Sequence, residues 1–69
     1  LWKVPRIMVP ADIERVLGAF GAAAGRAASA GCGWLDLNFA HGYLQHCFLS
    51  PVINRRTDQY GGGFENRIR

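Results

Sequence analysis

The 69-residue sequence predicts an α/β fold with a parallel sheet. Two observations predict it: an apolar helical stripe runs through residues 11–30, and a short apolar strand over residues 34–40 follows directly. A helix followed within a few residues by a buried strand is half of a β–α–β unit, from which parallel sheets are built. One small domain is the upper limit, because at this length only about 60% of the unfolded surface can be buried.

Residues 1–10 are expected to be extended, because Pro5 and Pro10 disfavour helix in the residues before them. The next apolar residues recur at the spacing of one helix face: Ile13, Val16, Leu17, Phe20, Ala24 and Ala27. Pro10 suits the first helical position, and Asp12 lies in the first turn, where the helix dipole favours negative charge. Val9 has no side-chain acceptor, so the sequence predicts a weak N-cap.

Residues 34–40 (WLDLNFA) lie between glycines and contain only two polar side chains, which is typical of a buried strand. Residues 42–63 are expected to form a long connection, and long connections in compact folds are often functional. Residues 64–69 resemble the first turns of another helix, with Glu65 placed to interact with the helix dipole.

The composition, 19% charged and 49% hydrophobic, is that of an ordinary soluble protein. The longest uncharged run in the apolar middle covers ten residues, 16–25, whereas a membrane-spanning helix needs about 20. Cys32 and Cys47 lack the spacing of a metal site and suit free thiols in a reducing compartment. We therefore expect a cytoplasmic protein with no membrane span and no metal.

Polar side chains gather where the predicted strand ends, at Asn38, His41 and Tyr43. They converge only if the chain leaves regular pleating near Ala40 and turns at Gly42, as it can at the carboxyl end of a barrel strand. An imidazole and an amide together can bind a carbonyl or an oxyanion, and a tyrosine can deliver a proton. Spacing alone favours a structural role, with a capping asparagine, a loop histidine and a packed tyrosine.

Longer blocks of sequence surround these residues: 5–6 (PR), 34–37 (WLDL), 40–44 (AHGYL), 48–51 (FLSP), 54–62 (NRRTDQYGG) and 65–67 (ENR). In this order they resemble the old yellow enzyme family of FMN-dependent NAD(P)H oxidoreductases, over essentially the whole chain. A narrower likeness, in residues 34–37 and 40–43, is to the reductase-like domain of bifunctional aryl-CoA monooxygenases that act on anthraniloyl- or salicylyl-CoA.

The resemblance implies a TIM (β/α)8 barrel, in which residues 1–69 are a partial domain, incomplete at both ends. They would supply the helix before strand 4, strand 4, a long loop and the start of the next helix. The implied cofactor is FMN, with NADH or NADPH as hydride donor. The implied reaction is hydride transfer to the activated C=C of an α,β-unsaturated carbonyl or aryl-CoA-type small molecule. We expect the 69 residues to need the remainder of the barrel for activity, and the oligomeric state is open.

By resemblance, Asn38 and His41 bind the substrate oxygen and Tyr43 is the catalytic proton donor, while the flavin-binding residues stay unassigned. The sequence departs from the family at Asn38, where histidine is commoner. An amide still donates a hydrogen bond but cannot become cationic, so we expect weaker stabilisation of an anion.

Two other classes of function stay open, namely a non-catalytic basic protein that binds nucleic acid or a partner, and a truncated product without function. The net charge is +3, and Arg55 and Arg56 are adjacent, but no nucleic-acid-binding module accompanies them, so we expect no nucleic-acid partner. We expect instead that Arg55, Arg56 and Arg67 pair with Asp58, Glu65 and backbone carbonyls and hold the long loop.

Overall fold

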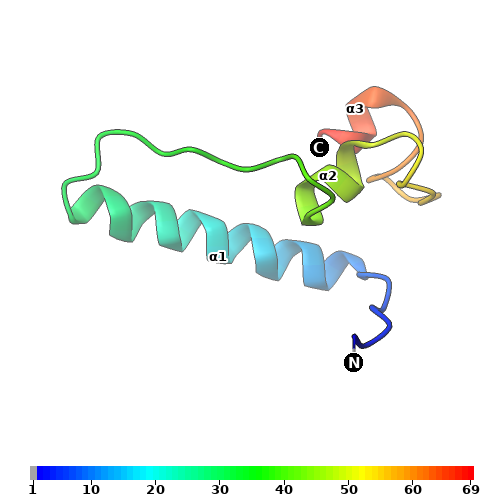
Figure 1. The fold of residues 1–69 in the computed structure, drawn as a ribbon, viewed down its shortest axis with the longest axis horizontal. Coiled ribbons are helices and arrows are strands. Elements are labelled where there is room, and N and C mark those ends of the chain that lie inside the picture. The colour runs from blue at the N-terminus through cyan, green and yellow to red at the C-terminus, as the bar shows by residue number, and fades with distance from the viewer. Residues whose placement is uncertain (1) are drawn as a thin grey trace. The chain divides into compact units, whose positions relative to one another are not determined.

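A computed structural model describes residues 2–69, in which the chain forms helices α1 (Pro10–Ser29), α2 (Leu44–Leu49) and α3 (Phe64–Arg67) (Figure 1). The chain forms two compact units, and the boundary between them lies between residues 35 and 36. Helix α1 belongs to the first unit, and α2 and α3 belong to the second.

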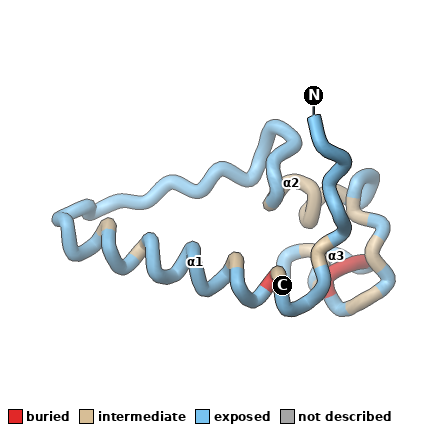
Figure 2. The backbone as a smooth tube through the Cα atoms, turned by 90° about the horizontal axis from the view of Figure 1, so that it is seen from below, coloured by how far each residue is buried: buried red, intermediate tan, exposed pale blue. Residues whose placement is uncertain are grey.

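Helix α1 confirms the helix predicted over residues 11–30, with Pro10 at its first position. One side of the helix is the less exposed, as Figure 2 shows along its length. Ile13 on this stripe is buried, whereas Leu17 and Phe20 remain 51% and 43% exposed. The apolar stripe is therefore present but only partly covered within this chain.

The N-terminus of α1 is stabilised from the third helical position. Val9 gives no side-chain cap, as predicted, but the carboxylate of Asp12 accepts a hydrogen bond from the Val9 N–H at 3.0 Å. Both oxygens of Asp12 are also held by Arg6, with Nη1–Oδ2 at 2.6 Å and Nη2–Oδ1 at 2.7 Å. A planar guanidinium matches a carboxylate in this two-pronged geometry, so the missing cap is replaced by an ion pair.

The strand predicted over residues 34–40 is not confirmed. No segment of residues 2–69 pairs as a β-strand, and residues 34–40 form an irregular run that is exposed throughout. A strand exists by hydrogen bonding to a neighbouring strand, and the described part of the chain supplies no such neighbour. The α/β class consequently lacks support from this chain's own secondary structure.

The prediction of an unbroken connection over residues 42–63 is wrong in its first part, because α2 occupies Leu44–Leu49. This helix is too short to show helical periodicity, and neither an acidic first turn nor a side-chain cap marks its start. The helix expected from residue 64 is confirmed as α3, which ends at Arg67. It follows Gly63, which provides no side-chain cap.

The loop between α2 and α3 is organised around Asn54. Its Nδ2 donates to the carbonyls of Phe48 and Tyr60, at 2.7 and 2.8 Å, and its Oδ1 accepts from the Arg56 N–H at 3.0 Å. The Tyr60 ring is buried and meets Phe48 edge-on, with the ring centroids 6.5 Å apart. One amide side chain thus closes the loop in place of regular secondary structure.

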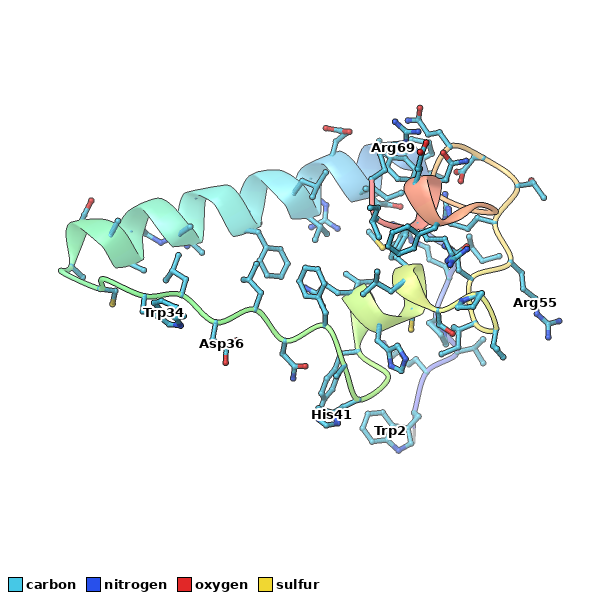
Figure 3. The ribbon with its side chains drawn as sticks, turned by 90° about the horizontal axis from the view of Figure 1, so that it is seen from above. Trp2, Trp34, Asp36, His41, Arg55 and Arg69 are labelled. Atoms are coloured by element: carbon cyan, nitrogen blue, oxygen red, sulfur yellow. The ribbon has the colours of Figure 1, made fainter. Side chains whose placement is uncertain are left out.

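Arginines hold this loop, as expected for two of the three. Arg56 pairs with both carboxylate oxygens of Asp58, and this bond lowers the pKa of Asp58. Arg67 donates to the carbonyls of Leu49 and Gly62, at 2.9 and 2.6 Å, and joins α3 to the end of α2. The prediction fails for Arg55, whose side chain points outward (Figure 3) and has no hydrogen bond or ion pair within residues 2–69.

Gly61 is required by the backbone that this loop brings against it. A Cβ atom at Gly61 would lie 2.2 Å from the Arg56 carbonyl oxygen. We expect Gly61→Ala to destabilise the loop by about 1–3 kcal/mol, the usual cost of overpacking. Amide hydrogen exchange in residues 54–61 should then be roughly five to 150 times faster.

Gly63→Ala is the matched control, since a Cβ at Gly63 would meet nothing within 4 Å. Exchange in residues 54–61 should stay near the wild-type rate in this variant. Equal protection of the loop in Gly61→Ala and wild type would contradict the close approach.

The Arg6–Asp12 pair makes the start of α1 resistant to acid. The hydrogen bonds from Arg6, followed by that from the Val9 N–H, hold the pKa of Asp12 well below its usual range. A lowered pKa stabilises the fold above the unfolded value, about 3.9, and this stabilisation disappears only as the pH falls through the folded value. Asp12 should therefore remain ionised at pH 3–4 in an NMR titration of its carboxyl carbon.

Arg6→Gln removes the positive charge and should move the Asp12 midpoint upward, toward the ordinary value. The Val9 N–H remains as a donor in that variant. A midpoint that does not change on this substitution would show that Arg6 does not hold the carboxylate.

Candidate functional site

The three predicted site residues lie in the second unit, on one short stretch that leads into α2. Asn38 lies in the extended run, His41 at the turn and Tyr43 at the N-cap of α2. All three are exposed, Tyr43 to 63%, and Figure 3 shows the His41 ring on the outside of the turn. Within residues 2–69 the side chains of His41 and Tyr43 have no hydrogen-bond partner, so an imidazole and a phenol are available to a ligand.

The backbone orients the amide of Asn38. Its Oδ1 accepts a hydrogen bond from the Ala40 N–H at 3.0 Å, in the local pattern that asparagine forms with the residue two positions on. With its oxygen engaged, the amide has its Nδ2 group left to donate, and no described residue accepts from it. Asn38 is thus set as a hydrogen-bond donor, the role that binding of a substrate oxygen requires.

The turn after Ala40 places two successive residues in the left-handed region, His41 at φ 61° and Gly42 at φ 77°. The Tyr43 N–H donates back to the Ala40 carbonyl at 3.4 Å and closes the turn. Glycine adopts this conformation readily, but for a residue with a side chain it costs about 1–2 kcal/mol. The sequence placed the turn at Gly42 and missed the left-handed His41.

Helix α2 holds the backbone of Gly42 on both sides. The Gly42 N–H donates to Nδ1 of His46 at 2.8 Å, and the thiol of Cys47 lies 3.5 Å from the Gly42 carbonyl oxygen as a weak donor. The sequence did not predict this role for His46 and Cys47. The signal available was position: the third residue of a helix can reach back to the backbone before the helix.

Metal binding and membrane insertion find no structural support here. Among residues 2–69, no three histidine, cysteine or carboxylate side chains are grouped to hold a metal ion. None of the helices in this part of the chain combines the length and the hydropathy needed to cross a bilayer.

The available groups are hydrogen-bond donors that suit an oxygen atom of a ligand. An amide N–H, an imidazole and a phenol are the donors that a carbonyl or phenolate oxygen needs. The flavin-binding residues stay unassigned, and the glycine run before α3 is engaged in bonds within the loop. In the glycine run 61–63, the Gly61 N–H bonds to the Asp58 carbonyl, and the carbonyls of Gly61 and Gly62 accept from Asn66 and Arg67.

The chain is similar to known proteins over nearly its whole length. Residues 2–69 match the NADH:flavin oxidoreductase / NADH oxidase family. The chain is 56% identical over 66 residues to the NADH:flavin oxidoreductase FG08077 of Gibberella zeae, covering 96% of this chain and 16% of that protein. It is 49% identical over 67 residues to an NADPH dehydrogenase of Bacillus velezensis, covering 97% and 20%.

A third relative, an NADPH dehydrogenase of Clostridium acetobutylicum, is 46% identical over 67 residues, which cover 97% of this chain and 20% of the relative. The chain therefore spans about a fifth of the length of these curated relatives. Its match to the family extends through every described residue, including the turn and both flanking helices. The chain belongs to the NADH:flavin oxidoreductase / NADH oxidase family.

Proposed function

We propose that the full-length protein is an FMN-dependent NAD(P)H oxidoreductase that reduces the activated C=C of an α,β-unsaturated carbonyl compound. Asn38 and His41 bind the carbonyl oxygen, and Tyr43 is the proton donor. The observation that carries the proposal is the bond from the Ala40 N–H to Oδ1 of Asn38, which leaves Nδ2 as a donor on the same short stretch as the unpartnered His41 imidazole and Tyr43 phenol. Membership of the family supports the flavin and the nicotinamide donor.

In this proposal, residues of this chain bind the substrate's carbonyl oxygen and donate the proton to its α-carbon. When bound, FMN reduced by NAD(P)H supplies the hydride that adds to the β-carbon. Asn38 Nδ2 and the His41 ring donate to the carbonyl oxygen, where negative charge develops. Tyr43 gives its phenol proton to the α-carbon and regains one from water, so the C=C gains one hydride and one proton.

The remainder of the protein supplies the other parts of the site. In a TIM barrel of about 250 residues, catalytic groups come from the carboxyl ends of several strands, and residues 34–40 would be one of these strands. The flavin-binding residues stay unassigned. The names of the relatives include both NADH and NADPH, so the reductant is NADH or NADPH. The cytoplasmic location stays a prediction.

The substrate class follows from Asn38. A neutral amide suits an uncharged carbonyl better than a preformed anion, because it adds no positive charge. An aryl-CoA-type substrate, suggested by the narrower likeness, stays a prediction. The alternative of a basic binding protein is not favoured, since Arg56, Arg67 and Arg69 donate to groups of their own chain.

Substitution of Tyr43 by phenylalanine tests proton donation. Tyr43→Phe in the full-length, FMN-loaded enzyme should slow reoxidation of the flavin by cyclohex-2-enone by about 10²–10⁴-fold, the usual contribution of a general acid. Reduction of the flavin by NADPH should be unchanged. Stopped-flow absorbance of the flavin measures the two half-reactions separately.

Ferricyanide is the control oxidant for this variant, since it accepts electrons without needing a proton on carbon. Its reduction should proceed equally fast in Tyr43→Phe and wild type. Equal reoxidation rates with cyclohex-2-enone in the two proteins would remove Tyr43 from the mechanism.

The role of Asn38 is tested by the binding of phenol, measured through the flavin absorbance. Asn38→Leu removes a neutral hydrogen bond and should weaken binding by about two- to twelvefold. Asn38→His restores a donor that can become cationic and should bind the phenolate more tightly than wild type, because charge-assisted hydrogen bonds are about twice as strong. Affinities that are the same in all three proteins would place the oxygen away from position 38.

A further inference from the structure

Resting on the proposed function, we infer that His46 is a positioning residue for substrate binding: it holds the strained turn that presents His41. The observation is the bond from the Gly42 N–H to Nδ1 of His46, 2.8 Å long. His46 does not contact the proposed substrate and would act through the backbone next to His41.

The turn needs such a restraint because of its backbone conformation. His41 adopts φ 61°, which disfavours any residue with a Cβ, and Gly42 continues the turn at φ 77°. The closing bond of the turn, from the Tyr43 N–H to the Ala40 carbonyl, is 3.4 Å and therefore weak. Without further contacts, His41 gains by returning to negative φ, and the direction in which the backbone presents its ring then changes.

The contacts that oppose this relaxation come from α2. Nδ1 of His46 fixes the N–H of Gly42, while the Cys47 thiol, 3.5 Å from the Gly42 carbonyl, adds a weaker contact on the other side. Helix α2 is itself anchored, because the Phe48 and Leu49 carbonyls accept bonds from the side chains of Asn54 and Arg67. The strained peptide is thus tied to a helix that two distant side chains hold.

The bond also defines the protonation of His46. An imidazole nitrogen accepts a hydrogen bond only when it carries no proton, so the neutral ring has its proton on Nε2. The half-buried His46 and the exposed His41 therefore have different roles. The first restrains a backbone, and the second offers its ring to the substrate.

The test compares His46→Leu with His46→Gln in the full-length, FMN-loaded enzyme. Leucine has no acceptor, whereas glutamine at the third helical position can reach back to the N–H. His46→Leu should raise the Kd for phenol and the KM for cyclohex-2-enone by about three- to tenfold, the effect of one hydrogen bond. His46→Gln should recover most of this loss, and the rate of flavin reduction by NADPH should stay constant in both variants.

Gln45→Leu is the matched control, since it introduces the same side chain one position away on α2 without removing a described hydrogen bond. Its Kd and KM should equal those of wild type. If His46→Leu behaves like Gln45→Leu, or if glutamine rescues nothing, the positioning role is overturned.

A readout independent of catalysis separates this inference from the proposed function. In wild-type protein with ¹⁵N-labelled histidine, the His46 ring should show an unprotonated Nδ1, and exchange of the Gly42 amide should be slowed. In His46→Leu that amide should exchange about three to ten times faster. A protonated Nδ1 or an unprotected Gly42 amide in wild type would overturn the inference. If wild-type enzyme shows the unprotonated Nδ1 and the protected Gly42 amide but does not bind phenol, the proposed function and the substrate-positioning role are both overturned. Only the hydrogen bond from Gly42 to His46 is then supported.

Discussion

The side chain of Asn54 is the contact on which the second unit depends. Its three hydrogen bonds join the end of α2 to the loop around Tyr60, where neither helix nor sheet supplies backbone pairing. With that end fixed, α2 can hold Gly42, and Gly42 places His41. The Asn54 side chain thus supports the turn at His41 from a distance, because backbone carbonyls removed from water need donors and a single amide provides two of them.

The sequence predicted the parts of the fold that have a periodic or capping signal. The apolar stripe gave α1 to within one residue at each end, and a glycine run before Phe64 gave α3. Helix α2 was not predicted, because its six residues make too few turns for a helical period of apolar residues to be recognised. The strand predicted over residues 34–40 is not present in the described residues, because a strand needs hydrogen bonds from a neighbouring strand and an apolar run alone does not provide them.

For the candidate site, the sequence indicated side chains but not the contacts that hold them. Residue types drew attention to Asn38, His41 and Tyr43, and the resemblance to the old yellow enzyme family supplied their predicted roles. The left-handed φ of His41 and the bond from Gly42 to His46 depend on backbone geometry, which residue types do not encode. For the loop arginines, the sequence identified Arg56 and Arg67 correctly, but which carbonyls they would meet required coordinates.

The two halves of the proposed oxygen-binding pair depend on different forces. His41 and Tyr43 are placed by bonds among residues 40–47, all of which lie within one unit. Asn38 lies on a run without regular secondary structure whose apolar side chains are exposed, Trp34 to 87%. Several local hydrogen bonds therefore set the backbone that carries the imidazole and the phenol, whereas the amide of Asn38 is oriented by the single bond from the Ala40 N–H.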